Sequence, residues 1–402
     1  MLRPLFLFVS CLLLPLSALA QPATPSVILQ IPTDDPFSQV NELLWSPDGT
    51  AVLAAYGDGV TVWDAATGDP RLTLEVSGRA WWGADAATVL THDFLDREVT
   101  SWNLDTGESR YALPNTEPLD LVSPDGALML TVAGAVVTVR DTATGEPQHT
   151  LEDFPLNWRW MGASQVVTTT QDAFQQWDLQ TGALQDTFAF EWQPIDIQPN
   201  WMVTRQQAED SARMRLYDME QGLPVRQYRL QDNRVGQAVV SPDGDTLYVV
   251  SAQSDSDGDY VIVWNVEISR GIRLLVSQAE PHRVRVMRPS PDGSRLLTLS
   301  YPLDPETQQD VAASARLTLW DVTSGEVQAR QQIPGMVDAL WQDSGEQFLV
   351  WGLEGGALLN ADSGDIVHTF DGPTQGAAFG PNGDQFATWG GQQIRLWNLN
   401  QR

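Results

Sequence analysis

The sequence has no lysine and only one cysteine. All 23 basic residues are arginines, 52 residues are acidic, and the formal net charge of the 402-residue chain is −29 at pH 7. A surface this acidic repels phosphates, so nucleic acid and anionic lipid are not expected partners. High solubility accounts for such a charge, and binding of cations or of a basic partner is the alternative. The cysteine, Cys11, lies in an N-terminal apolar run, so the remainder of the chain has no disulfide, thiol nucleophile or cysteine-bound metal.

Long hydrophobic runs are also missing, except near the N-terminus. Arg3 is followed by an apolar run from Leu5 to Leu16 and by the small-x-small sequence Ala18-Leu19-Ala20. This order is typical of a cleaved signal peptide, and the run is too short to span a bilayer. We therefore expect residues 1–20 to be a signal peptide, residues 21–402 to form one mature domain, and the protein to be secreted or periplasmic. Lipidation at Cys11 is the alternative.

What the sequence does contain is one short pattern, repeated along its length. A β-rich run ends in an aromatic residue followed by Asp or Asn, and a glycine turn comes a few residues later. Nine places fit at spacings of 37 to 56 residues, and the third, fifth and eighth are degenerate at the aromatic position. The nine places are Trp63-Asp64, Trp102-Asn103, Arg140-Asp141, Trp177-Asp178, Tyr217-Asp218, Trp264-Asn265, Trp320-Asp321, Asn360-Ala361 and Trp397-Asn398.

A second marker precedes most of these places. Ser-Pro-Asp-Gly begins at Ser46, Ser123, Ser241 and Ser290, and weaker relatives occur at 83–86, 343–345 and 380–383. Proline presets φ, aspartate caps the turn, and glycine accepts a positive φ. The marker therefore predicts a tight turn between two strands, and local chemistry explains it without a functional role.

Between the markers, apolar and polar residues alternate with a period of two, and each unit has room for four short strands. Four-stranded units of about 40 residues ending in Trp-Asp resemble those of the WD-repeat β-propeller family. The resemblance covers almost all of residues 21–402 and implies an all-β, closed propeller. The family's Gly-His pair is largely missing, since the chain has only four histidines. We therefore expect the polar network of many family blades to be absent or reduced, and packing to hold the blades together.

The number of units predicts the number of blades. Nine units predict a single propeller of nine four-stranded blades, and eight blades are the alternative because the units ending near Tyr217 and Asn360 are the most degenerate. The last unit stops after its third strand, whereas residues 26–31 form a strand that has no unit of its own. Pairing of these two segments would close the ring and remove two exposed sheet edges.

Motifs for catalysis are missing as well. The chain has no Gly-x-Ser-x-Gly elbow, no His-Glu-x-x-His and no phosphate-binding glycine loop, so we predict that it is not an enzyme. His149 and His368 occupy equivalent positions in the repeat, which indicates a structural role on an outer strand. His92 is expected in a loop, with metal binding as an alternative, and His282 is expected to pack near the family's Gly-His position.

One acidic stretch has the spacing of metal ligands. Asp255, Asp257 and Asp259 alternate within residues 254–260, and Gly258 permits a sharp bend. Several oxygen ligands from one short loop suit Ca²⁺, although the bidentate glutamate of such loops is missing here. A solvated hairpin tip is the alternative, and no other cofactor is expected.

Departures from the repeat indicate where function lies. In the family geometry, the hairpins before the tryptophan strand lie on the face opposite the Ser-Pro-Asp-Gly turns. Three consecutive units have lengthened hairpins there, at 205–213, 252–259 and 300–315, and loops on a rigid scaffold commonly carry function. Neutral insertion is the alternative. The candidate binding residues near this face are Arg283, Arg285, Arg288, Trp81 and Trp158; pairing with local acids and packing in the core are the alternatives for these arginines and tryptophans.

The sequence therefore predicts an exported, non-enzymatic scaffold, monomeric by itself, that binds a protein or peptide through the face with the lengthened hairpins. The alternative is an enzyme or small-ligand sensor with a polar site in the central channel. There, Arg283 or Arg285 would hold a carboxylate or phosphate. A pocket in which Arg, Asp and His converge would favour the alternative.

Overall fold

The structure, a computed structural model, describes most of the chain beyond the N-terminal segment. In the described part there are 35 β-strands in nine separate sheets. No helix in that part is long and apolar enough to cross a membrane. The described residues are 24–116, 122–134, 136–155, 158–170, 173–189, 192–198, 200–207, 211–219, 221–231, 234–252, 259–267, 270–275, 281–304, 306–307, 309–311, 315–332 and 335–399.

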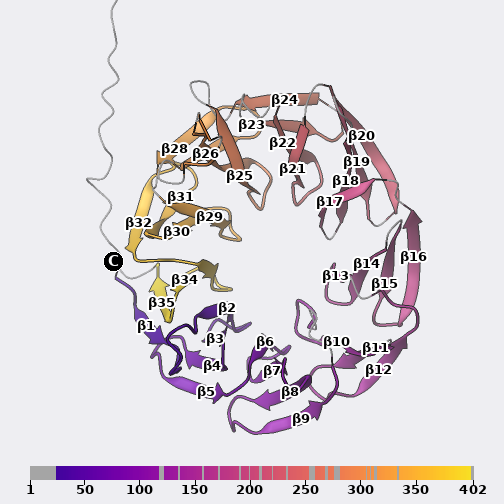
Figure 1. Cartoon of the computed structure of the whole chain (residues 1–402), viewed down its shortest axis with the longest axis vertical. Helices are drawn as coiled ribbons and strands as arrows, with labels where there is room; N and C mark the ends of the chain where they lie inside the picture. Colours follow the sequence, from indigo (N-terminus) through magenta and orange to yellow (C-terminus); the bar gives the residue numbers. More distant parts are fainter. Residues whose placement is uncertain are drawn as a thin grey trace, which may run out of the picture.

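Each sheet is a blade of a propeller, and we number the blades 1 to 9 in chain order (Figure 1). Eight blades have four strands, and blade 3 has three among the described residues, which correspond to the second, third and fourth strands of the other blades. The strands are β2 (Val40–Trp45), β3 (Ala51–Tyr56), β4 (Gly59–Asp64) and β5 (Pro70–Leu74) in blade 1; β6 (Gly78–Trp82), β7 (Thr88–Asp93), β8 (Glu98–Asn103) and β9 (Ser109–Leu113) in blade 2; β10 (Leu128–Ala133), β11 (Val136–Asp141) and β12 (Pro147–Leu151) in blade 3; β13 (Trp158–Trp160), β14 (Gln165–Thr169), β15 (Ala173–Asp178) and β16 (Ala183–Ala189) in blade 4; β17 (Gln193–Ile197), β18 (Trp201–Gln207), β19 (Ser211–Asp218) and β20 (Leu223–Gln231) in blade 5; β21 (Arg234–Val240), β22 (Thr246–Ala252), β23 (Asp259–Asn265) and β24 (Arg270–Leu275) in blade 6; β25 (His282–Pro289), β26 (Arg295–Pro302), β27 (Arg316–Asp321) and β28 (Val327–Gln332) in blade 7; β29 (Met336–Trp341), β30 (Gln347–Gly352), β31 (Gly355–Asn360) and β32 (Ile366–Asp371) in blade 8; and β33 (Gly376–Phe379), β34 (Gln385–Gly390), β35 (Gln393–Asn398) and β1 (Val27–Gln30) in blade 9.

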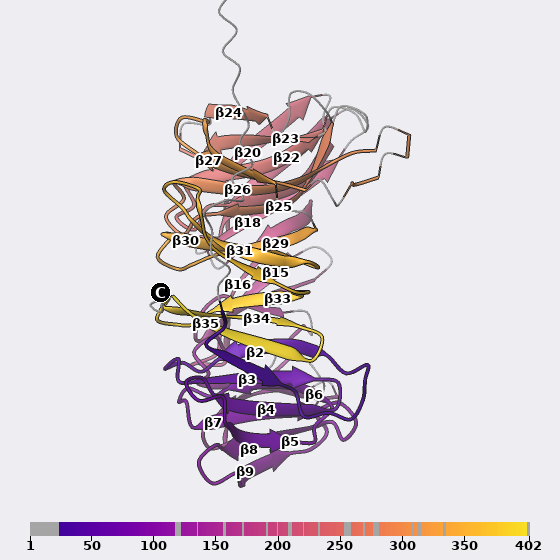
Figure 2. The same ribbon diagram turned by 90° about the vertical axis from the view of Figure 1, so that its left-hand side faces the viewer.

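The blades surround a central axis, with the first strand of each blade innermost and the last outermost (Figure 1). Blades 9 and 1 lie side by side, and a hydrogen bond of 3.3 Å from the Trp45 indole Nε1 to the Ala378 carbonyl links them. Seen edge-on, the ring is a disc from which the connection between β26 and β27 projects on one side (Figure 2). The prediction of an all-β, nine-bladed propeller is confirmed.

Blade 9 combines strands from both ends of the chain. β1 pairs antiparallel with β35 along its whole length and is the outermost strand of the blade. Leu29 of β1 and the following Ile31 are buried in one cluster with Val40 and Trp63 of blade 1. β1 is therefore hydrogen-bonded to the last blade and packed against the first.

The Ser-Pro-Asp-Gly turns have the chemistry that their sequence predicts. In blade 1 the Ser46 hydroxyl donates to Asp48 Oδ1 at 2.7 Å and accepts from the Ala51 amide at 2.9 Å. Asp48 Oδ1 also accepts from the Thr50 amide at 3.0 Å, and Gly49 has a φ of 73°. The same two hydrogen bonds of the serine hydroxyl, one to the aspartate and one from the amide five residues later, recur in the turns that begin at Ser123, Ser241 and Ser290. These four turns are placed by local hydrogen bonding.

A second recurring bond joins the two middle strands of a blade. The indole nitrogen of the third-strand tryptophan donates to a threonine hydroxyl of the second strand at 2.9 to 3.3 Å, in the pairs Trp102–Thr91, Trp177–Thr168, Trp320–Thr298 and Trp397–Thr388. In blade 3, Arg140 stands in place of the tryptophan, and its Nε donates to Thr131 Oγ1 at 3.0 Å. A polar link between the two middle strands therefore remains in these five blades without a histidine. The polar network expected from the family is reduced rather than absent.

We expect Arg140→Leu to destabilise the protein by about 1–3 kcal/mol, because it leaves the buried Thr131 hydroxyl without this donor. Arg140→Trp supplies the indole that other blades use and should cost less. Guanidinium unfolding followed by far-UV circular dichroism compares the two variants. Equal losses would contradict a role for the donor.

The two most degenerate units both form complete blades. Tyr217 is buried in β19 of blade 5. In blade 8 the sequence marker Asn360-Ala361 is one residue too late, because Leu359 takes the aromatic position. Asn360 takes the place of the aspartate, since its Oδ1 accepts bonds from the Asp362 and Ser363 amides at 2.9 Å and so caps the turn.

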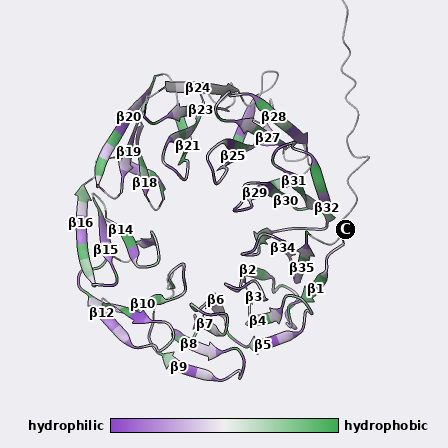
Figure 3. Ribbon diagram, turned by 180° about the vertical axis from the view of Figure 1, so that it is seen from behind, coloured by the Kyte–Doolittle hydropathy of each residue, from purple (hydrophilic) through white to green (hydrophobic). Residues whose placement is uncertain are grey.

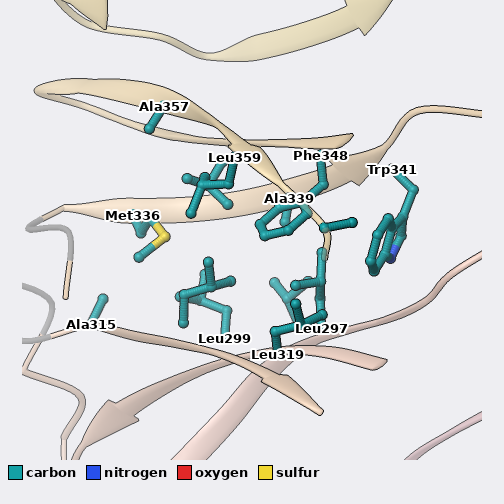
Figure 4. Close-up of a cluster of buried hydrophobic side chains, with 14 of the residues drawn as sticks. Leu297, Leu299, Ala315, Leu319, Met336, Ala339, Trp341, Phe348, Ala357 and Leu359 are labelled. Atoms are coloured by element: carbon teal, nitrogen blue, oxygen red, sulfur yellow. The ribbon is translucent and has the colours of Figure 1, made fainter. Parts of the chain in front are cut away.

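Neighbouring blades pack through apolar side chains. Hydrophobic and hydrophilic residues are interspersed along the strands (Figure 3), so that each blade can bury apolar residues against its neighbours. Figure 4 shows one such cluster between blades 7 and 8, where Leu299 and Leu319 lie opposite Leu359 and Phe348. The core thus lies between the sheets and leaves both faces of the disc to the turns and hairpins.

Candidate functional site

The disc has two unlike faces. The turn face carries the turns after the first and third strands of each blade, including the Ser-Pro-Asp-Gly turns. The hairpin face carries the hairpins between the second and third strands and the connections between blades. The division follows from antiparallel pairing, in which the chain reverses at alternate ends of the blade.

Most of the exposed large apolar side chains lie on the hairpin face. Ten large apolar side chains are exposed among the described residues, and seven of them lie in these hairpins and connections or at the strand ends beside them. They are Phe37, Phe94, Leu95, Val136, Val311, Val337 and Leu353. The other three, Ile28, Leu184 and Leu223, lie on outermost strands at the rim. The seven come from the connection into blade 1 and from blades 2, 3, 7 and 8, so they share a face and are distributed around it. A face that carries most of the exposed large apolar side chains is the better candidate for an interaction surface.

The lengthened hairpins differ in what they add. After β26, residue Leu303 forms an isolated bridge with Asp310, so the blade 7 hairpin is a loop folded on itself. In blade 5 the described part of the extra length is strand, because β18 and β19 extend into 205–213 and lengthen the hairpin. Residues 208–210 and 253–258 lie outside the described residues.

Two predicted arginines of β25 contact the blade 7 hairpin. Both guanidinium groups pair with the Asp310 carboxylate. Arg283 Nη1 lies 3.8 Å from Asp310 Oδ1, and Arg285 Nε lies 2.5 Å from Asp310 Oδ2. The Asp310 side chain is 19% exposed, against 33% and 51% for the arginines. Both arginines therefore hold the hairpin against the inner strand, which is the local pairing considered as the alternative to anion binding.

Asp259 belongs to the same region. It begins β23 rather than lying at a hairpin tip, and its Oδ2 accepts a hydrogen bond from the Val284 amide at 2.9 Å. Burial raises the pKa of its carboxyl, while that bond and the nearby Arg283 and Arg285 oppose the rise. Asp255 and Asp257 lie outside the described residues, so the calcium hypothesis for the three stays untested. Within the described residues, no group of three or more acidic, histidine or cysteine side chains is arranged to hold a metal.

Charged side chains of the inner strands pair between neighbouring blades. Arg288 Nη2 of β25 donates to Asp338 Oδ1 of β29 at 3.0 Å. Arg79 Nη2 of β6 lies 3.4 Å from Glu42 Oε1 of β2. These arginines thus bridge adjacent blades and do not converge with other charges on one point of the channel.

Of the two predicted tryptophans, Trp81 adjoins the turn face, so its expected place near the lengthened hairpins is wrong. Trp81 is the fourth residue of β6, and an inner strand begins at the hairpin face and ends at the turn face. Trp158 is the first residue of the three-residue β13 and pairs with Thr168 of β14, so it lies within blade 4. Trp81 is buried beside Val122 and Met129, and the Trp158 ring centroid lies 5.5 Å from that of Phe154.

All four histidines lie in strands. His92 is fully buried in β7, and its Nε2 is 2.9 Å from the Thr116 carbonyl oxygen, so the expectation of a loop there is wrong. β7 runs from Thr88 to Asp93, so the strand continues through this histidine before the hairpin begins. His149 and His368 lie on the outermost strands β12 and β32, as predicted. His282 is buried at the start of β25, which agrees with the packing role expected for it.

Sequence reasoning missed the exposed apolar residues. Phe37 lies in the connection between β1 and β2, and Leu353 lies in the hairpin between β30 and β31. A large apolar residue in a hairpin tip, where Gly, Asn, Asp and Ser prevail, is the signal that would have found them.

Comparison with known proteins supports the fold. No protein-family model matches the chain, and no curated protein matches its sequence. Among solved structures, the Dos1 propeller is similar with a TM-score of 0.52 at 9% identity, covering 94% of this chain and 95% of that one. The C-terminal WD40 domain of Sif2 is similar with a TM-score of 0.50 at 9% identity, covering 94% and 98%. BamB from Moraxella catarrhalis aligns with a TM-score of 0.47 at 10% identity, covering 93% and 99%. At these identities the Dos1 and Sif2 structures support a WD-repeat-type β-propeller fold.

Proposed function

We propose that this chain is a non-enzymatic scaffold that binds a protein or peptide through its hairpin face. The observation that carries the proposal is that seven of the ten exposed large apolar side chains of the described residues, Phe37, Leu95 and Leu353 among them, lie on that one face. Aromatic and apolar anchors are the groups that drive association at protein interfaces. A ring of packed sheets would present them on a rigid base.

Acidic residues accompany the apolar ones. Asp93 and Asp96 flank Leu95, and Glu354 follows Leu353. Complementary charge speeds encounter and selects partners. We therefore propose a partner that offers apolar side chains within a basic surface.

The inner strands support a scaffold over an enzyme of the central channel. Arg288 and Arg79 are each engaged with a carboxylate of the adjacent blade, and Arg283 and Arg285 share Asp310. An anion site in the channel would need several arginines that point toward one place. These four arginines are instead paired with separate carboxylates or with Asp310.

Site-specific photo-crosslinking tests the proposed face. With a benzophenone side chain at Leu95 or Leu353, we expect one and the same higher-mass product in the cells that produce the protein. The matched controls are Leu184 and Leu223, which are also exposed leucines, at 43% and 59% against 80% for Leu95 and 67% for Leu353, but lie on outermost strands. The same product from the rim positions, or no product from Leu95 and Leu353, would contradict the proposal.

We also propose that the protein is exported and that cleavage follows Ala20. The charged start, the apolar run and the small residues before Gln21 support this. The intact mass of the protein purified from its own cells reports the first residue, and a chain that still carries residues 1–20 would contradict export by cleavage.

We further propose that β1 holds the ring closed. Two features support this, namely its pairing with β35 and the burial of Leu29 and Ile31 against blade 1. A strand bound to both the last and the first blade would resist opening between them.

A further inference from the structure

Blade 2 departs from its neighbours in the turn after its first strand. Blades 1 and 3 have Ser-Pro-Asp-Gly there, whereas residues 83–86 of blade 2 read Gly-Ala-Asp-Ala. The turn of blade 2 therefore lacks the proline ring, although Pro47 and Pro124 stand on either side of it. An open cavity of about 420 Å³ lies at this place on the turn face.

The cavity has an aromatic lining with acidic groups at its edge. Its walls include three indoles, those of Trp45, Trp81 and Trp82, together with Pro47 and Pro124. Two carboxylates, those of Glu42 and Asp125, also line it. The Glu42 side chain is 29% exposed, and Asp125 is exposed. Indole faces attract cations, so the aromatic and the acidic parts of the lining favour the same kind of ligand.

The three indoles are not equivalent. Trp45 Nε1 donates to the Ala378 carbonyl and Trp82 Nε1 to the Leu44 carbonyl, both at 3.3 Å, and these bonds fix their rings. The Trp81 indole nitrogen makes no hydrogen bond within the described residues, and it is not among their buried, unpartnered polar atoms. Trp81 lines the cavity and is 8% exposed, so its N–H is the indole donor that a ligand carbonyl in the cavity would meet.

The chain itself shows how a guanidinium group sits here. The Arg79 guanidinium carbon lies 5.4 Å from the centroid of the Trp81 ring, and Arg79 Nη2 lies 3.4 Å from Glu42 Oε1. One cation is thus already held by an indole and a carboxylate beside the cavity. The Asp125 carboxylate belongs to the neighbouring blade 3, and its Oδ1 accepts bonds from the Ser123 hydroxyl and the Ala127 amide. Among the described residues no bond engages its Oδ2, which is the atom for a second cation.

We propose that this cavity binds an extended peptide segment of a partner that carries a basic side chain, with its apolar stem against the tryptophans and prolines and its charge at Asp125. A backbone carbonyl of the segment accepts from Trp81 Nε1. An extended backbone suits the site because its carbonyls are unpaired. The cavity lies on the turn face, so the inference does not depend on the proposed hairpin-face function.

Titration of the mature protein, labelled with ¹⁵N at tryptophan, tests the proposal. The probes are the peptides acetyl-Pro-Arg-Pro-amide and acetyl-Pro-Gln-Pro-amide, and the signal is the Trp81 indole N–H, assigned with Trp81→Phe. We expect a saturable shift with the arginine peptide and about tenfold weaker binding of the glutamine peptide, the ratio that one exposed ion pair and one cation–π contact provide together.

Asp125→Asn and Asp292→Asn form a matched pair, because both aspartates occupy the same position of a Ser-Pro-Asp-Gly turn. We expect Asp125→Asn to weaken binding of the arginine peptide several-fold and Asp292→Asn to leave it unchanged. Three results would each overturn the proposal: a Trp81 signal unmoved at about 10 mM peptide, equal binding of the two peptides, or equal effects of the two variants.

Discussion

Replacing both Leu29 and Ile31 by alanine is expected to lower the melting temperature by roughly 5–15 °C. Both side chains are almost fully buried, and each large-to-small change in such a site costs about 2–5 kcal/mol. They belong to a cluster with Val40 and Trp63, so the loss falls on the junction between the last and the first blade. Differential scanning calorimetry measures the effect.

The same strand supplies its own control. Ile28 is 58% exposed, and its neighbour Gln30 is exposed as well, although both are paired with β35. Ile28→Ala together with Gln30→Ala should therefore shift the melting temperature by no more than a few degrees. Deletion of residues 21–34 should cost at least as much as the buried double variant. An unchanged melting temperature after that deletion would show that the ring does not depend on β1.

The turns could be predicted from sequence because their chemistry is local. Ser46, Asp48 and Gly49 lie within four residues, and every bond that shapes the turn joins neighbours in the chain. The repeat then multiplied a weak signal, since a single Trp-Asp pair carries little information and nine spaced markers, six of them with tryptophan, identify a propeller. This is why the fold was predictable although no family model matches.

The candidate site was less predictable because it depends on which strand ends meet. Trp81 was placed on the wrong face because a position early in a unit does not reveal the direction of the inner strand. The surface that includes Phe37 and Leu353 comes from hairpins and connections more than 300 residues apart in the chain, and only the arrangement of the blades around one axis brings them to the same face. The partner of Arg285 is Asp310, in the lengthened hairpin, and no spacing rule in the sequence joins the two.

Phe348→Ala is expected to destabilise the protein by about 3–5 kcal/mol, which is the usual cost of removing a fully buried aromatic side chain. Phe348 is 1% exposed in β30, and its ring centroid lies 5.1 Å from that of Trp341. The ring also packs in the cluster between blades 7 and 8 (Figure 4), so its loss leaves a cavity at a blade junction. Denaturant unfolding followed by circular dichroism measures the change in the free energy of unfolding.

The Phe348 variant also tests whether blade 8 supports the ring, since its unit is among the most degenerate in sequence. Leu359 and Asn360 replace the usual Trp-Asp there, yet Leu359 is fully buried in the same cluster as Phe348. Val337→Ala in the same blade is the control, because that side chain is 51% exposed and should change stability by less than about 0.5 kcal/mol. If Phe348→Ala were as mild as Val337→Ala, blade 8 would contribute little to the stability of the core. A large loss confined to Phe348→Ala would show that apolar packing holds blade 8 in the ring although its unit lacks the Trp-Asp marker.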